Sequence, residues 1–299
     1  MSRALRPEVL QGKVFRAHDV LRDGVLTRDQ LRSSAWQRLF HGIYCDAALP
    51  ASFGLRVRGA RLLAPPAAAF CGRTAAYLHG ATSLVEVDDP VEVLVPPSSR
   101  FGAAGGLRVR RGQLAAADAV RLGTVRCTTG LRTAVDIARL EPLENAVPAL
   151  DVLLASGIVE RAALTSATSA LTEVRGARRA RRAAAFADAR AESQPESRLR
   201  LLLALAGLPA VPQYVVRDAA GFIARVDLAY PELCVAIEYD GAWHGEAGQL
   251  RRDRRRLNRL VAAGWTVLHV TAVDLRSPAL LLQQVRTVLD AQIRERGLR

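Results

Sequence analysis

The sequence has little of several residue types, and each shortage excludes a class of protein. Lys13 is the only lysine among 42 basic side chains, and 5% of the 299 residues are aromatic. The four cysteines lie far apart without a CxxC pair, which argues against a zinc ribbon or a disulfide framework and fits a reducing cytoplasm. No segment approaches the roughly 20 apolar residues of a membrane-spanning helix, and the first residues do not resemble a signal peptide. We therefore expect a cytoplasmic protein with no membrane partner.

What the sequence does have is arginine. The net charge is +13, and half of the residues are hydrophobic, which suffices for a globular interior. A guanidinium group binds two phosphate oxygens at once, so an arginine-rich surface favours a nucleic-acid partner, with DNA as the first expectation. A GC-rich genome would also explain the excess of arginine over lysine, although it explains the net charge less well.

The length and the changes in pattern predict three domains. They are a winged-helix-like domain, an α+β middle domain and a C-terminal α/β domain, at residues 1–65, 66–190 and 191–299. In the first, Thr27 and Gln30 have the spacing of a helix capping box, and Gly42 marks the turn of a hairpin. Helices followed by a hairpin are typical of a winged helix, and another small α+β module explains the pattern equally well.

A run of arginines precedes the third domain. Its members are Arg175, Arg178, Arg179, Arg181 and Arg182. The run is compatible with a phosphate-contacting helix or linker, and also with an ordinary solvated helix surface. Pro195 interrupts the helical pattern that follows and predicts a boundary there.

The C-terminal domain reads as helices packed against a mixed sheet, which gives an α/β fold class. We expect helices at 196–206, 249–263 and 278–294, and strands at 213–218, 222–229, 233–240 and 265–270. A two-residue turn at 231–232 would place Asp227 opposite Ala236 and Glu238 opposite Arg225.

Three acids of this hairpin, Asp227, Glu238 and Asp240, are expected on one face of the sheet, because side chains alternate along a strand. Like charges this close destabilise a sheet, and a divalent cation would relieve the repulsion. The sequence therefore predicts a catalytic site for Mg²⁺ or Mn²⁺. A polar, solvent-facing strand is the alternative.

Neighbouring segments add matching groups. Glu196 lies at the inward end of its helix, either as a metal-site acid or as a favourable charge at the helix N-terminus. His244 is a candidate metal ligand or proton-transfer group, or a simple loop residue. Asp253 falls on the apolar face of the next helix, where a structural pair with Arg256 is slightly favoured over direct catalysis. The arginines expected to bind the nucleic-acid backbone are Arg251, Arg252, Arg254, Arg255 and Arg259.

These residues together resemble the endonuclease-like domains related to the very-short-patch repair (Vsr) nucleases, within the PD-(D/E)XK restriction-endonuclease-like superfamily. The resemblance covers about the last hundred residues. It implies a Mg²⁺-dependent phosphodiesterase in which Asp227 and Glu238 are the strand acids and Glu196 is the helix acid. The motif position that usually holds lysine is Asp240 here. His244 or an arginine would have to replace that cation.

The first two domains resemble, more weakly, AbiEi-type antitoxin or transcriptional-regulator proteins of actinobacteria. The resemblance rests on segments 24–31, 38–44, 74–80 and 128–136. The leading hypothesis is a metal-dependent DNA endonuclease linked to DNA repair, defence or a toxin–antitoxin system. The alternative is a non-catalytic DNA-binding regulator or antitoxin with a degenerate nuclease domain, or a module that binds a protein partner in such a system.

Overall fold

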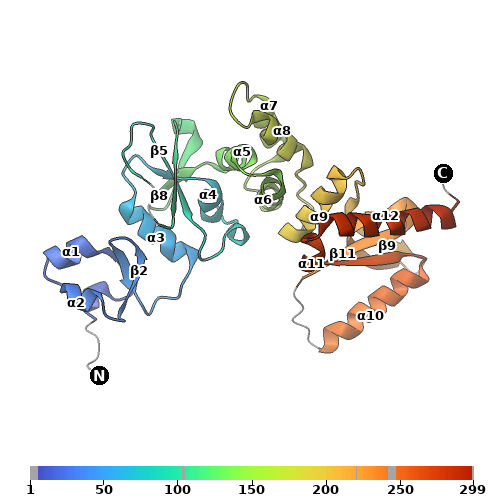
Figure 1. The fold of residues 1–299 in the computed structure, drawn as a ribbon, viewed down its shortest axis with the longest axis horizontal. Coiled ribbons are helices and arrows are strands. Elements are labelled where there is room, and N and C mark those ends of the chain that lie inside the picture. The colour runs from blue at the N-terminus through green and yellow to red at the C-terminus, as the bar shows by residue number, and fades with distance from the viewer. Residues whose placement is uncertain (1–5, 103–104, 220, 242–246, 298–299) are drawn as a thin grey trace. The chain divides into compact units, whose positions relative to one another are not determined.

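The computed structural model describes residues 6–102, 105–219, 221–241 and 247–297, and for residues 247–253 it describes the backbone alone. The chain is a mixed α/β protein, as the sequence predicts. It divides into two compact units, which are drawn in Figure 1. Unit 1 consists of Met1–Ile137 and Ile158–Leu164, and unit 2 of Ala138–Gly157 and Thr165–Arg299. The division into three domains stays a prediction.

Unit 1 begins with a three-stranded antiparallel sheet of order β1-β3-β2. Its elements are the 3-10 helix η1 (Glu8–Leu10), β1 (Val14–Arg16), α1 (Ala17–Arg22), α2 (Arg28–Leu31), β2 (Trp36–Phe40) and β3 (Ile43–Asp46). The predicted capping box is present: Gln30 N donates to Thr27 Oγ1, and Thr27 N donates to Gln30 Oε1. Gly42 has a φ of 72° in the turn between β2 and β3, a conformation that glycine adopts without strain.

The rest of unit 1 is built on a five-stranded sheet of order β6-β5-β4-β8-β7. Its elements are α3 (Phe53–Leu63), β4 (Ala69–Phe70), α4 (Gly72–Leu78), η2 (Thr82–Leu84), β5 (Val91–Val95), β6 (Leu107–Arg111), η3 (Ala116–Asp118), β7 (Ala119–Leu122), β8 (Val125–Thr128) and α5 (Gly130–Leu140). One hydrophobic core joins α3 to this sheet through residues such as Phe53, Val57, Phe70 and Val93.

A buried charge lies at the start of α4. Glu92 is 1% exposed and accepts hydrogen bonds from Arg108 Nη1 (2.7 Å), Arg110 Nη2 (3.2 Å) and the Arg73 backbone N (3.1 Å). Gly72 lets the carboxylate reach this position: its φ is +54°, and a Cβ there would lie 1.5 Å from Glu92 Oε2. The backbone of Gly72 thus makes room for a carboxylate that arginines neutralise.

Unit 2 begins with helices α6 (Leu143–Ala155) and α8 (Ala177–Phe186); α7 (Arg161–Ser169) lies between them in the chain. Helix α8 carries four of the five clustered arginines, while its alanines Ala177, Ala180, Ala183 and Ala184 are buried. The arginine run therefore forms the exposed side of a helix.

The sheet of unit 2 has the order β12-β11-β10-β9, with β11 and β12 parallel and the other pairs antiparallel. Its elements are α9 (Gln194–Leu205), β9 (Val211–Asp218), β10 (Gly221–Tyr230), η4 (Pro231–Leu233), β11 (Val235–Asp240), α10 (Ala247–Ala262), β12 (Thr266–Thr271), α11 (Ala272–Leu275) and α12 (Pro278–Glu295). The seven helices and strands predicted for this domain are confirmed, with ends that differ by a few residues.

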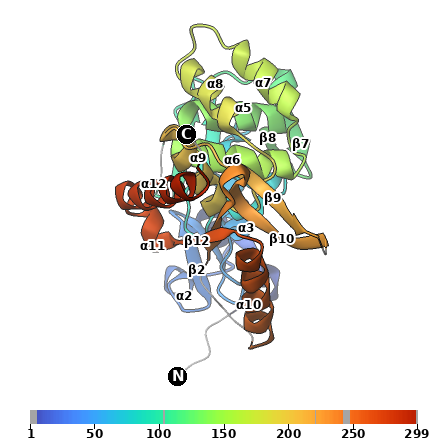
Figure 2. The same ribbon diagram turned by 90° about the vertical axis from the view of Figure 1, so that its right-hand side faces the viewer.

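Helices cover both faces of this sheet (Figure 2). On one face, Leu199 of α9 and Leu281 and Val285 of α12 share a core with Ile237. On the other, Leu260 of α10 belongs to a second core. Across the described residues, no helix is both long and apolar enough to cross a membrane.

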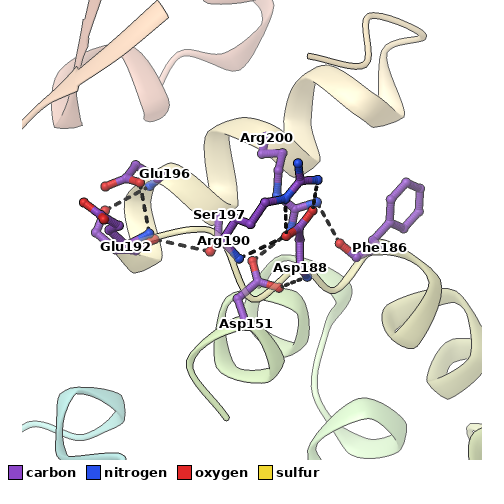
Figure 3. Close-up of polar contacts among 9 residues, drawn as sticks. Asp151, Phe186, Asp188, Arg190, Glu192, Glu196, Ser197 and Arg200 are labelled. Atoms are coloured by element: carbon purple, nitrogen blue, oxygen red, sulfur yellow. Dashed lines mark hydrogen bonds and ion pairs between the residues drawn. The ribbon is translucent and has the colours of Figure 1, made fainter. Parts of the chain in front are cut away.

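A buried ion pair joins α6 to α9 (Figure 3). Asp151 Oδ2 accepts from Arg200 Nη2 at 2.8 Å, and Asp151 Oδ1 accepts from the Asp188 backbone N at 2.6 Å. Arg200 Nη1 also donates to the Phe186 carbonyl at 2.7 Å. Burial raises the pKa of Asp151, although the Arg200 charge opposes that effect. The pair fixes α9, which carries Glu196 in its first turn, to the preceding helices of unit 2.

Candidate functional site

The hairpin of β10 and β11 has a different register from the predicted one. Leu228 lies opposite Ile237, which is a shift of two residues, so the expected pairs of Asp227 with Ala236 and of Glu238 with Arg225 were wrong. The cause is the turn: residues 231–233 form the 3-10 helix η4, and Cys234 follows with a φ of 47°. Continuing the observed register by one residue puts Asp227 opposite Glu238.

Glu238 is the buried acid of the site, with 6% of its surface exposed. Arg256 Nη2, on α10, donates to Glu238 Oε2 at 2.5 Å. Glu238 Oε1 is buried and has no hydrogen-bond partner within the part of the chain that the structure describes. A buried oxygen without a partner is costly, so this atom is suited to a ligand that supplies a proton or a positive charge.

Asp227 lies beside Glu238. Its Oδ2 accepts a hydrogen bond from the Tyr239 backbone N at 2.8 Å. Burial raises the pKa of Asp227, the Glu238 charge raises it further, and the Tyr239 bond and the Arg256 charge oppose the increase. The two carboxylates therefore form a partly buried acidic pair with one arginine near it.

Glu196 approaches this pair from α9. Ser193 caps the helix by accepting from Glu196 N, and Pro195 stands in the first turn, so this proline begins the helix rather than interrupting one. Glu196 Oε2 accepts from the Glu192 backbone N at 3.1 Å and from Gln213 Nε2 at 3.0 Å. Burial raises the pKa of Glu196, and the charge of Asp227 adds to the effect. Glu196 is therefore close enough to Asp227 for the two charges to interact.

Asp240 lies at the exposed end of β11 and contacts His269 of β12, with 3.1 Å between Asp240 Oδ2 and His269 Nδ1. His269 was not singled out from the sequence. Its segment was predicted as a strand, but the parallel pairing that sets His269 opposite Glu238 was not. Gln213 was missed as well, and no sequence pattern marks its unusual φ of 52°.

The predicted basic groups have separate positions. Arg254 and Arg255 are exposed on α10, and Arg259 Nη2 bonds to Asp218 Oδ2 at 3.2 Å. Arg256 pairs with Glu238, while the predicted structural pair of Arg256 with Asp253 stays a prediction. His244 and the side chains of Arg251, Arg252 and Asp253 lie outside the described residues.

The sequence predicts that Asp227, Glu238 and Glu196 hold a metal ion. Among the described side chains, no group of three or more Asp, Glu, His or Cys residues is arranged to hold a metal ion. Mg²⁺ is commonly held by one or two carboxylates and several waters. Asp227 and the free oxygen of Glu238 are compatible with that requirement.

The chain is a mixed α/β protein that has a cluster of acidic side chains on its C-terminal sheet. No protein-family model matches the chain. Two proteins of Mycobacterium tuberculosis, the uncharacterized proteins MT2308 and Rv2248, are each 31% identical over 273 residues, which cover 89% of this chain and 98% of theirs. The chain belongs to the family of these uncharacterized proteins.

A solved structure, that of the RV2827C protein from Mycobacterium tuberculosis, covers 69% of this chain and 83% of its own. Its sequence is 18% identical and the TM-score is 0.39. A similarity this low supports no conclusion about function.

Proposed function

We propose that unit 2 is a metal-dependent phosphodiesterase that acts on DNA, with a restriction-endonuclease-like core. The observation that carries the proposal is the buried Glu238 Oε1, which has no hydrogen-bond partner among the described residues and lies beside Asp227. Two acids that repel each other on neighbouring strands destabilise a sheet unless a cation joins them. A divalent metal ion is a ligand that would satisfy both observations.

In this proposal, Asp227 and Glu238 hold the ion and Glu196 completes the acidic side of the site. When bound, Mg²⁺ would activate a water molecule and neutralise the charge that develops on the phosphodiester. Arg256 donates a hydrogen bond to Glu238, and it would stand in for the lysine that the motif lacks. The exposed Arg254 and Arg255 would bind the DNA backbone.

The experiment compares cleavage of plasmid, single-stranded and mismatched DNA, and of RNA, by the full chain with Mg²⁺ or Mn²⁺. Glu238→Gln keeps the shape of the side chain and removes its charge, so we expect activity to disappear. Glu232→Gln is the matched control, because Glu232 lies exposed in the turn of the same hairpin. Cleavage by Glu238→Gln at the wild-type rate, or no cleavage by the wild type, would contradict the proposal.

A second candidate function is a DNA-binding regulator or antitoxin whose nuclease core has lost cleavage. It is favoured by the ion pair between Arg256 and Glu238, because a guanidinium already neutralises the acid that would bind the metal. It predicts promoter binding that is unchanged by Asp227→Asn and Glu238→Gln in an electrophoretic mobility assay. A protein partner from a toxin–antitoxin or defence system would co-purify with the chain in that case.

A further inference from the structure

Unit 1 contains a cavity that three arginines line. It has a volume of about 330 Å³, within the range of small-molecule sites, and lies where the end of α3 meets β4 and the hairpin of β7 and β8. Arg61, Arg121 and Arg126 contribute the charges. No acidic side chain belongs to the lining that the structure describes.

The strand pairing brings two of these charges together. Arg121 of β7 lies directly opposite Arg126 of β8 in the antiparallel ladder. Like charges in that position destabilise a sheet, and in the described chain neither arginine, nor Arg61, forms an ion pair with a carboxylate. An anion bound between them would remove the repulsion.

Two of the guanidinium groups are held in position by the fold. Arg61 Nη1 donates to Thr124 Oγ1 at 2.7 Å, and Arg126 Nη1 donates to the Ala67 carbonyl at 3.0 Å. Each guanidinium has five N–H groups, so both keep donors for a ligand. Arg121 is exposed and makes no side-chain bond to any residue in the described ranges. The cavity therefore has two positioned cations and one cation that is free to close on a ligand.

We propose that this cavity binds the phosphate monoester of a nucleotide. The dianionic group matches the three arginines that line the cavity, because a guanidinium binds phosphate through paired hydrogen bonds. Pro65, Pro66 and Val125 form an apolar part of the lining, against which a sugar or base can pack. The phosphate comes from a free nucleotide or from the 5′ end of a DNA strand. The inference goes beyond the proposed phosphodiesterase, whose acids belong to unit 2.

The test is isothermal titration calorimetry of the full chain in EDTA, where a metal-dependent reaction makes no contribution. We expect 5′-AMP to bind and adenosine not to bind. Arg121→Gln should weaken 5′-AMP binding about ten-fold, since one charge-assisted hydrogen-bond pair is lost. The matched control is Arg58→Gln, which removes an exposed arginine of α3 that does not line the cavity.

A short oligonucleotide with a 5′-phosphate, compared with the same strand ending in a 5′-hydroxyl, distinguishes the two sources. Tighter binding of the phosphorylated strand assigns the site to a strand end, and binding of 5′-AMP alone assigns it to a free nucleotide. Equal binding of adenosine and 5′-AMP, equal effects of Arg121→Gln and Arg58→Gln, or no binding of any phosphorylated probe would overturn the proposal. A cleavage assay of the same preparation reports separately on the acids of unit 2.

Discussion

Replacing Arg200 by methionine tests the ion pair that connects α6 to α9. The side chains of Asp151 and Arg200 are 1% and 10% exposed, so the pair is buried on both sides. Methionine keeps much of the apolar stem of arginine and removes the charge. The variant leaves the Asp151 carboxylate in the interior with two uncharged partners, the Asp188 backbone N and the Ser197 hydroxyl.

The expected loss in the free energy of unfolding is about 3–5 kcal/mol, the usual cost of removing one partner of a buried ion pair. The loss depends on pH. The pKa of Asp151 is already raised above its ordinary value of 3.8, and without Arg200 it rises further. The folded state then holds a proton that the unfolded state releases, so stability is retained at low pH and decreases as the pH rises through the folded-state pKa.

The assay is urea unfolding followed by circular dichroism at several pH values. Arg198→Met is the control, since Arg198 is an exposed residue of the same helix. The double variant Asp151→Leu with Arg200→Met should regain most of the lost stability, because it leaves no buried charge. If Arg200→Met and Arg198→Met differ by less than about 1 kcal/mol at neutral pH, the buried pair does not have the role inferred here.

Three further predictions concern other buried acids. Gly72→Ala should lower the free energy of unfolding by at least about 3 kcal/mol, because it adds left-handed backbone strain and a clash with Glu92; chemical denaturation measures it. Asp227→Asn should stabilise the chain at pH 8 by removing a poorly solvated charge, and the gain should shrink as the pH falls through the folded-state pKa. A difference in stability that does not change with pH would contradict the raised pKa of Asp227. Arg256→Met should increase the rise in unfolding temperature that Mg²⁺ causes, because the guanidinium no longer competes with the metal for Glu238. A smaller rise than in the wild type would contradict this competition and show that Arg256 assists metal binding.

Much of unit 2 could be predicted from the sequence, because its helices and strands have clear periodicity. The alternation of apolar and acidic residues predicted the strand that contains Glu238, and it predicted that Asp227 lies on the same face of the sheet. The error of two residues in the register left both side chains on that face, since side chains alternate with a period of two. The 3-10 turn that caused the error has no strong signal beyond Pro231.

Long-range pairings could not be predicted. The pairing of Arg256 with Glu238 was not predicted, because sequence spacing reveals neighbours three or four residues apart on a helix and not those that approach from a sheet. The approach of His269 to Asp240 and of Arg200 to Asp151 depends on how whole elements pack. The proposed identity of the fold and of its site residues stays a prediction.

The backbone at Gln213 has a consequence for which substitutions this chain can accept. Its φ of 52° belongs to a region that side chains other than glycine, asparagine and aspartate rarely adopt. Glycine has no carboxamide, and that of asparagine is one methylene shorter, so neither matches the reach of Gln213 Nε2 to Glu196. A substitution that relieved the backbone strain at residue 213 would stabilise the fold but would remove the hydrogen bond to Glu196. At this position, selection for stability and selection for the proposed activity would therefore favour different residues.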